Sequence, residues 1–340
     1  MAAFYDARGN TYFVAAPEEI GGFADVPRSA AAAASARERW ARPAIERICG
    51  RKHVSAGLEA GSGKRYRSDG LLLGPFAEEG AFALLIVNTD ATLAERSGNG
   101  LTIFSQYLLD TGLVKRSDAF VLRVYHDAPG SHFIEALIEA DEREGRMGFW
   151  IDMGVPAYGA AAVGAAPEHF GASEFNRHIV ARVHALEEIE ASWTCSQFVS
   201  VGNPHCVTFL QDPALLPSMA QLWSRNWMPR LSAIANSSAS DGTRGAGRPC
   251  TAGINLQWAC VTGKDSIDAR VFERGEGPTL SSGSSATAVA SAARKLELLD
   301  ANTVNVRMPG GLAPVRFDER NGNLQRVMLF GEARRANPPA

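Results

Sequence analysis

The sequence predicts an α+β fold made of two similar domains. At 340 residues, the chain is long enough for two domains of ordinary size, each with its own hydrophobic core. Short apolar runs typical of strands alternate along it with periodic or alanine-rich stretches typical of helices. In each half a strand-like run is followed by a glycine turn and a helix start, a recurrence typical of a duplicated unit.

The predicted elements are distributed over both halves of the chain. In the first half, apolar runs predict strands at 4–16 (broken at Gly9-Asn10), 71–73, 82–87, 119–125, 133–138 and 149–153. In the second half they predict strands at 197–201, 207–210, 254–262, 267–272, 304–308, 313–317 and 327–330. The pattern predicts helix over 18–51 and 214–234. A turn at 154–156 indicates a domain boundary near residues 150 to 160.

The composition argues against nucleic acid and membrane as partners. Apolar residues make up 46% of the chain and charged residues 21%, as in globular proteins. A net charge of −3 provides no basic surface for nucleic acid or anionic lipid, and no run of about 18 apolar residues predicts a membrane span. The first residues lack the basic and apolar regions of a secretory signal, so we expect a cytoplasmic protein with a small polar ligand.

The cysteines and histidines do not form a recognisable metal or redox motif. The five cysteines are odd in number and widely spread, which argues against a disulfide framework or a CxxC motif. We expect them to be small buried hydrophobes: Cys49, Cys195, Cys206, Cys250 and Cys260. Six of the seven histidines show no metal-ligand spacing, so we expect no metal site.

Two helix starts are the best candidates for ligand binding. At 279–286 an extended segment gives way to an alanine-rich helical pattern, and at 97–100 a similar start follows another strand. The first N–H groups of a helix are unpaired and carry partial positive charge, which favours a bound carboxylate. A shift of 185 residues places Ser97-Gly98 on Ser282-Gly283 and Asn88 on Glu273. Two such helix starts facing one carboxylate would place the serines on opposite faces of the bound carbon, as proton removal and return require.

Several motifs resemble those of the diaminopimelate epimerase family and, more loosely, its superfamily with proline racemases and phenazine-biosynthesis isomerases. They run in the family's order from Gly9-Asn10 to the C-terminus. They are Arg-Ser-Asp-Gly-Leu-Leu-Leu at 67–73, Ser-Gly-Asn-Gly at 97–100, Asp-Met-Gly-Val-Pro at 152–156, Val-Gly-Asn-Pro-His-Cys-Val at 201–207, Glu-Arg-Gly-Glu-Gly at 273–277, Pro-Gly-Gly at 309–311 and Gly-Glu-Ala at 331–333.

The resemblance implies two pseudo-symmetric domains, each a barrel-like mixed sheet around a central helix, with the substrate bound between them. We expect an N-terminal domain over residues 1–152, completed by a C-terminal strand at about 327–340, and a C-terminal domain over 153–326. The implied activity is that of a cofactor-independent isomerase, a racemase or epimerase of amino-acid metabolism acting on an amino acid or related carboxylate. A homodimer is the commonest oligomeric state for such proteins.

The resemblance also implies roles for individual residues. Backbone N–H groups would bind the α-carboxylate at Gly98, Asn99, Gly100, Gly283 and Ser284. The remainder of the substrate would be bound by Asn10, Asn88, Asn203, Asn255 and Arg274. Glu273 and His205 would flank the reacting amine and tune the acid and base. Ser97 and Ser282 occupy the two catalytic positions.

Both catalytic positions depart from the family pattern, which has cysteine there. A thiol has a pKa of about 8.5, lowered further at a helix N-terminus, whereas a hydroxyl is a poor base unless another group takes its proton. The neighbouring segments 91–96 and 283–285 also differ from the family, and an insertion around 55–65 displaces an early loop. We therefore expect Glu273 or His205 to be the effective base, with Ser97 and Ser282 as relay groups.

Other interpretations of these residues remain open. The two serines can be helix caps only, His205 and the asparagines can be structural turn residues, and Arg274 can pair locally with Glu273. Cys206 is expected to pack rather than react. The scaffold can also serve double-bond migration, tautomerisation, elimination or cyclisation, or bind a carboxylate without turnover. A serine hydrolase is disfavoured because 281–283 lacks the G-x-S-x-G elbow.

Overall fold

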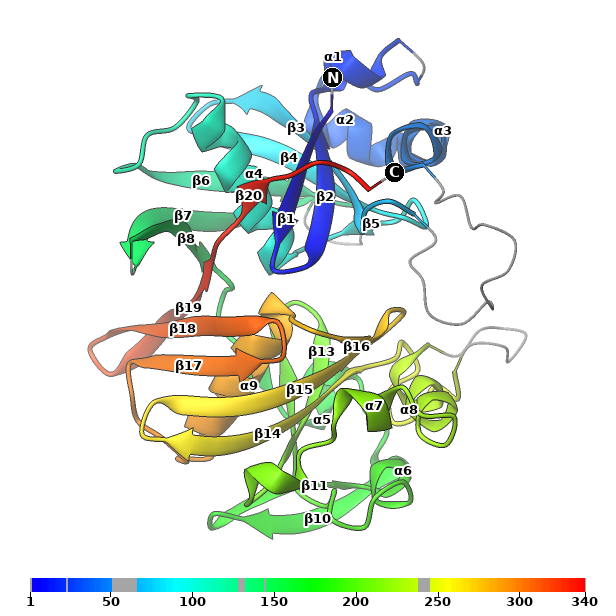
Figure 1. The fold of residues 1–340 in the computed structure, drawn as a ribbon, viewed down its shortest axis with the longest axis vertical. Helices are drawn as coiled ribbons and strands as arrows, with labels where there is room; N and C mark the ends of the chain where they lie inside the picture. The colour runs from blue at the N-terminus through cyan, green and yellow to red at the C-terminus, as the bar shows by residue number, and fades with distance from the viewer. Residues whose placement is uncertain are drawn as a thin grey trace. The chain divides into compact units, whose positions relative to one another are not determined.

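The computed structural model divides the chain into two compact units, coloured by residue number in Figure 1. The described residues are 2–22, 24–50, 66–127, 132–143, 145–237 and 245–339. The first unit is Met1–Asp152 with Gly331–Ala340, and the second unit is Met153–Phe330. The insertion expected around 55–65 lies outside the described residues. Among the described residues, no helix is both long and apolar enough to cross a membrane.

The first unit is a mixed sheet in which parallel and antiparallel pairs alternate from β1 to β6 and antiparallel pairs follow. From β1 to β8 the pairs are antiparallel β1–β2, parallel β2–β3, antiparallel β3–β4, parallel β4–β6 and antiparallel β6–β7 and β7–β8. The strands are β1 (Ala3–Ala7), β2 (Asn10–Ala15), β3 (Gly70–Glu78), β4 (Ala81–Asn88), β6 (Ala119–Tyr125), β7 (Phe133–Arg143) and β8 (Arg146–Asp152). The short strands β5 (Leu93–Ala94) and β20 (Arg334–Arg335) pair with β4 and β1.

The predicted break in the first strand is a two-residue hairpin turn. Arg8 and Gly9, between β1 and β2, have φ of 55° and 87°. Two consecutive positive φ values are what the tightest β-hairpin turns require, and glycine adopts them without steric cost. This hairpin places Asn10 at the first position of β2.

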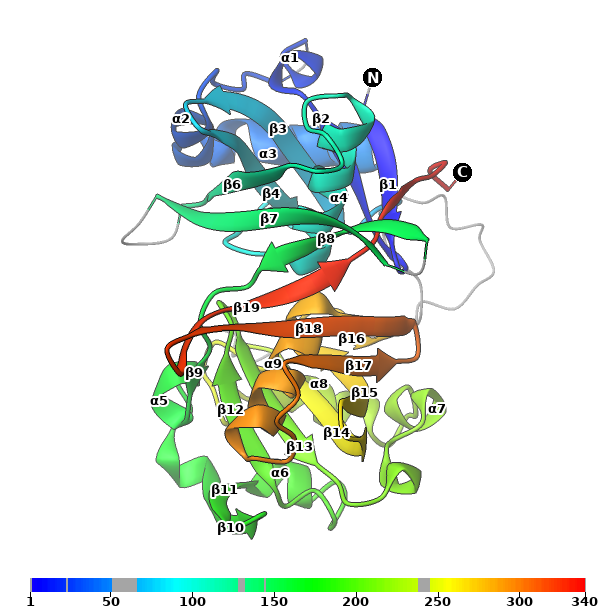
Figure 2. The same ribbon diagram turned by 90° about the vertical axis from the view of Figure 1, so that its left-hand side faces the viewer.

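Helix α4 (Gly98–Asp110) is the central helix of the first unit, visible among the strands in Figure 2. Leu101 and Phe104 are fully buried on it. A Cβ built at Gly100 would lie 3.5 Å from Leu72 Cδ2, and one built at Gly74 would lie 3.0 Å from the Phe104 ring. Glycines therefore give the room for α4 to approach β3 closely at these two points.

The helical segment predicted at 18–51 is helical but not continuous. It comprises α1 (Pro17–Ile20), α2 (Ala30–Ser35), α3 (Arg37–Ala44) and one π turn at Ile45–Cys49. Between α2 and α3, Ala36 has φ −95° and ψ 11°, which ends the first helix. Trp40 is fully buried and donates its indole N–H to Ala33 O at 2.8 Å, holding the two short helices together.

The second unit repeats the strand order of the first. Its pairs are antiparallel β12–β13, parallel β13–β14, antiparallel β14–β15, parallel β15–β17 and antiparallel β17–β18 and β18–β19. The strands are β12 (Ser196–Ser200), β13 (Pro204–Phe209), β14 (Asn255–Gly263), β15 (Ser266–Glu273), β17 (Thr303–Met308), β18 (Gly311–Arg320) and β19 (Asn323–Gly331). The α+β class and the duplicated plan predicted from the sequence are confirmed.

Helix α9 (Gly283–Lys295) is the counterpart of α4 and packs against the strands of the second unit (Figure 1). Its buried side chains are small, chiefly alanine with Val289, which allows the strands to approach it closely. Additional elements of this unit are β9 (Ala157–Tyr158), β10 (Phe170–Phe175), β11 (His178–Val183), β16 (Gly277–Thr279), α5 (Ala160–Val163), α6 (His184–Glu187) and 3₁₀ turns at Pro167–His169 and Pro213–Leu215.

The helix predicted over 214–234 is only partly formed. The structure has two short helices there, α7 (Met219–Leu222) and α8 (Met228–Ala235). Pro217 has no N–H to continue a helix, and Ser218 starts α7 afresh through a capping box with Gln221. Hydrophobic periodicity alone did not reveal this interruption.

Candidate active site

In the first unit, Ser97 caps the central helix. Ser97 has extended φ and ψ, and its Oγ accepts the Gly100 N–H at 3.0 Å. Its carbonyl accepts the Leu101 N–H at 2.8 Å, the first main-chain bond of the helix. The N–H groups of Gly98 and Asn99 precede that bond, so they are directed out of the helix end. The predicted helix start is confirmed, and its first turn contains no acidic residue that would repel an anion.

Three neighbouring strands end at one level in the first unit. Tyr12 of β2 pairs with Gly70 of β3, and Gly70 pairs with Asn88 of β4. Asn88 Nδ2 donates to Thr92 Oγ1 at 2.9 Å, so its side chain also stabilises the turn after β4. Asn10 lies two residues before Tyr12 on the same strand. The predicted ligands Asn10 and Asn88 therefore belong to one edge of the first unit.

In the second unit, Ser282 caps α9 in the same way. Ser282 has extended φ and ψ, its Oγ accepts the Ser285 N–H at 3.3 Å, and its carbonyl accepts the Ala286 N–H at 3.0 Å. Ser282 is 4% exposed, and the first turn of α9 again lacks acidic residues. Gly283 and Ser284 supply the outward N–H groups at this end.

His205 lies at the centre of a buried polar network beside α9. It is fully buried on β13, and its Nε2 is 2.8 Å from Asn203 Oδ1. Gln257 Nε2 donates to His205 Nδ1 at 2.9 Å and to Ser285 Oγ at 3.0 Å. Asn203 Nδ2 donates to Ser284 Oγ at 3.4 Å. Burial, reinforced by the charge of Arg274, lowers the pKa of His205 to about 3, so its imidazole is neutral at physiological pH.

Asn255 connects this network to the turn that carries Glu273 and Arg274. Its Nδ2 donates to Pro204 O at 3.2 Å, and its Oδ1 accepts the Arg274 N–H at 2.9 Å. Arg274 Nη1 donates to Ala252 O at 2.8 Å, and burial lowers the pKa of its guanidinium. Glu273 is half-buried at the last position of β15. Within the second unit, the structure therefore brings all these predicted residues to one corner, beside the α9 N-terminus.

Gln257 and Ser285 are the members of this corner that the motifs did not identify. Under the 185-residue shift they correspond to Leu72 and Gly100, whose contact in the first unit is apolar. The sequence signal that could have identified them is that both positions become polar in the second half: leucine is replaced by glutamine, and glycine by serine. Cys206, in contrast, is fully buried, and burial raises the pKa of its thiol to about 12, as expected of a packing residue.

The capping role predicts a modest and equal stability loss at the two serines. Ser97→Ala and Ser282→Ala each remove the oxygen that accepts a first-turn N–H. We expect each to lower the free energy of unfolding by about 1 kcal/mol, measured by urea denaturation. Ser→Gly at either position should lower the free energy of unfolding by only a few tenths of a kcal/mol. A loss above about 3 kcal/mol would contradict a simple cap.

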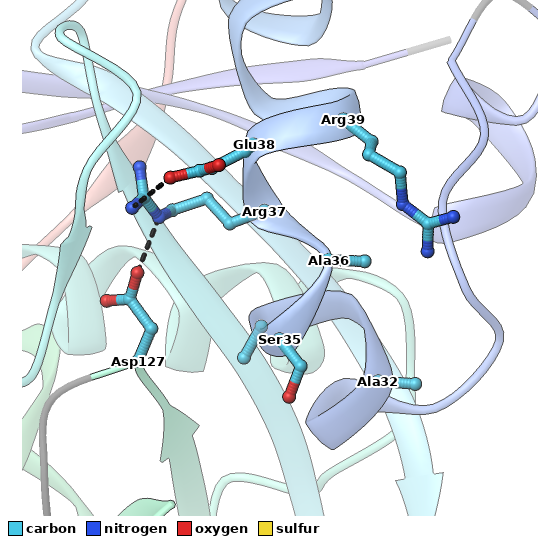
Figure 3. A pocket seen from close by; sticks show the side chains of 8 residues that line it. Ala32, Ser35, Ala36, Arg37, Glu38, Arg39 and Asp127 are labelled. Atoms are coloured by element: carbon cyan, nitrogen blue, oxygen red, sulfur yellow. Dashed lines mark hydrogen bonds and ion pairs between the residues drawn. The ribbon is translucent and has the colours of Figure 1, made fainter.

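One cavity in the first unit lies away from these residues. It has a volume of about 420 Å³ in the first unit, and its lining residues are Ala32, Ala34, Ser35, Ala36, Arg37, Glu38, Arg39 and Asp127. Figure 3 shows Arg37 directed toward Asp127, with Nε 2.6 Å from Oδ2. Arg37 also donates to Ala91 O, so its charge is engaged within the protein. Over the described residues, no three His, Cys, Asp or Glu side chains converge as metal ligands.

Comparison with known proteins identifies relatives of this architecture. The family model described as diaminopimelate epimerase matches residues 246–336. Diaminopimelate epimerase 2 of Nostoc sp. (strain PCC 7120) is 33% identical over 246 residues, covering 72% of this chain and 72% of the relative.

Two solved structures show the same fold. A probable proline racemase from Agrobacterium radiobacter K84, with bound carbonate, has a TM-score of 0.56 at 13% identity, covering 100% of this chain and 92% of that one. A methylitaconate-delta-isomerase has a TM-score of 0.55 at 14% identity, covering 99% and 94%. With a one-third identical relative over most of its length and the duplicated fold described above, the chain belongs to the diaminopimelate epimerase family of isomerases.

Proposed function

We propose that the protein moves a proton at the carbon beside the carboxylate of an amino acid or a related acid, without a cofactor, as a racemase or epimerase does. The observation that carries the proposal is the serine-capped helix start that follows the same strand order in each unit. Each start offers outward N–H groups to an anion. The sequence predicts that the N-termini of α4 and α9 bind the same carboxylate, and this part of the proposal stays a prediction.

Within this proposal, Glu273 is the base. A carboxylate can accept a proton in general base catalysis, whereas a serine hydroxyl is a poor base unless another group takes its proton. Both nitrogens of His205 are already hydrogen-bonded, so we assign His205 to positioning. Ser97 and Ser282 would donate or relay protons through their hydroxyls, whose oxygens accept main-chain N–H groups.

Solvent deuterium exchange tests the reaction class. Incubating the protein with diaminopimelate and a panel of amino acids in heavy water should introduce deuterium at the α-carbon of at least one of them, detected by mass spectrometry. Absence of exchange with every compound would count against the proposal. Thermal stabilisation by a compound that shows no exchange would instead indicate a carboxylate-binding protein without turnover.

Glu273→Gln is expected to lower kcat for this exchange by about 10²- to 10⁴-fold, because the amide cannot take a proton. Glu276→Gln, in the same exposed turn, is the matched control and should keep wild-type exchange. Equal exchange in the two variants would show that Glu273 is not the base.

A different proton-transfer reaction is the second candidate, and the serines at both acid–base positions favour it. Double-bond migration or tautomerisation of an unsaturated acid needs one carboxylate base rather than two thiols. The distinguishing result is that Glu273→Gln abolishes turnover of such an acid while Ser97→Ala and Ser282→Ala retain it. In α-carbon racemisation, both serine variants should instead impair turnover.

A further inference from the structure

Three hydrogen bonds beside α9 link Gln257 to Ser284 through His205 and Asn203. Gln257 Nε2 donates to His205 Nδ1, His205 Nε2 lies 2.8 Å from Asn203 Oδ1, and Asn203 Nδ2 donates to Ser284 Oγ. We call these four residues the donor chain. Because Ser284 Oγ receives a proton donor, its own O–H is directed elsewhere, and Ser284 is the second residue of α9. The donor chain therefore ends in a hydroxyl donor at the helix N-terminus.

Gln257 sets the direction of donation because of where its amide lies. It is fully buried in the middle strand β14, between Val207 of β13 and Val271 of β15. Its Nε2 serves both His205 and Ser285, and its Oε1 has no partner among the described residues. If the Gln257 amide were turned by 180°, its two N–H groups would be buried without a partner, whereas the present orientation leaves only its oxygen unpaired. The turned amide would therefore have the higher desolvation cost. The amide therefore acts as a double donor.

A double donor at Gln257 fixes the tautomer of His205. Nδ1 must be the bare, accepting nitrogen, so the single imidazole proton lies on Nε2. That proton orients Asn203 with its oxygen toward His205 and its NH₂ toward α9. In the other tautomer, Nε2 would need a donor, and Asn203 would turn its oxygen toward the site of a bound carboxylate.

The first unit has no such chain at the corresponding positions. Leu72 stands where Gln257 stands, and its contact with α4 is with the Cβ position of Gly100. At this position the first unit therefore has an apolar side chain, whereas the second unit has an amide donor beside α9.

We propose that Gln257 is a positioning residue that fixes the Nε2-protonated tautomer of His205 and so orients Asn203 and Ser284 as donors to a carboxylate at the α9 N-terminus. The carboxylate part rests on the proposed function. The tautomer part does not, because it concerns the free protein.

The first test is imidazole ¹⁵N NMR of the full chain labelled at histidine, with His205 assigned by His205→Gln. Wild type should show a bare Nδ1 and a protonated Nε2 from about pH 5 to 8. In Gln257→Glu, which has the same shape and whose ionised carboxylate only accepts, Nδ1 should gain a proton at a pH where that carboxylate is ionised. A protonated Nδ1 in wild type, or a bare Nδ1 in Gln257→Glu, would overturn the proposal whether or not any substrate is turned over.

The second test measures the carboxylate site. Gln257→Leu, which copies the first unit, should mix the two tautomers and weaken binding of diaminopimelate, or of the acid found by deuterium exchange, by about tenfold, corresponding to about 1.4 kcal/mol. In turnover, KM should rise by that factor with kcat nearly unchanged, as for loss of uniform binding. Gln197→Leu, on strand β12 at the other side of β13, is the control, because among the described residues its amide donates only to Phe198 O. If Gln257→Leu mixes the two tautomers of His205 but binds the carboxylate with unchanged affinity, the tautomer does not control ligand binding and this part of the proposal is wrong.

Discussion

Replacing both Ser97 and Ser282 by cysteine is expected to raise the rate of α-proton exchange by about 10²- to 10⁴-fold, the usual contribution of general acid–base catalysis. Each position caps a helix N-terminus, where the partial positive charge lowers the pKa of a thiol below its ordinary value near 8.5. The variant would thus have a thiolate base and a thiol acid where the wild type has two hydroxyls. Deuterium wash-in with diaminopimelate and other amino acids measures the effect.

The single variants and a hydroxyl-preserving control make this result interpretable. Ser97→Cys and Ser282→Cys alone should each gain much less than the double variant, because one reaction needs both an acid and a base and such residues are non-additive. The double threonine variant, which keeps both hydroxyls, should stay near the wild-type rate. A double cysteine variant that binds its ligand but exchanges no faster than wild type would show that the serines do not occupy acid–base positions.

Gly70→Ala is expected to destabilise the first unit by about 3 kcal/mol, the upper part of the usual range for overpacking. A Cβ at Gly70 would lie 2.4 Å from the Val87 carbonyl oxygen and 2.9 Å from the Tyr12 ring. The oxygen belongs to the paired strand β4, so β3 and β4 must separate where Asn88 ends the strand. Urea denaturation followed by fluorescence measures the loss, and ligand affinity should fall with it.

Gly22→Ala is the matched control for this change. Among the described residues, no atom outside the chain neighbours lies within 4 Å of a Cβ built at Gly22, so the substitution adds a methyl group without a collision there. We expect a change within about 0.5 kcal/mol, as for surface positions. Equal stability of the two variants would mean that β3 and β4 accommodate a side chain at Gly70.

The parts of this protein that the sequence predicted are those encoded by short local patterns. Ser97 and Ser282 were placed at helix starts because a serine followed by small residues and an apolar helical run is a cap pattern, and both capping bonds are present. The break at Gly9-Asn10, which is a hairpin turn in the structure, and the strand expected at 267–272 follow from turn residues and short apolar runs of the same kind.

The sequence predicted the helix boundaries poorly where a helical segment is interrupted, because hydrophobic periodicity is judged over a window longer than the interruption. The segment 214–234 has a helical pattern, but α7 begins only at Met219, after Pro217 and the cap at Ser218, and it ends at Leu222, before α8 begins at Met228. The segment 18–51 is divided at Ala36, where no proline or glycine marks the break. There the chain bends so that Trp40 can bury its ring and bond Ala33, a preference set by packing.

By itself, the sequence determined the duplicated α+β plan, the two serine-capped helix starts and the family, because these reside in ordered motifs and in a repeat of 185 residues. Only the tertiary structure decided how the residues around the α9 N-terminus are connected. Gln257 and Ser285 are 28 positions apart, and their bond exists because α9 packs on β14. Which nitrogen of His205 carries the proton, and hence which way Asn203 faces, depends on that buried contact, and buried polar groups are ordered by the partners that folding brings to them.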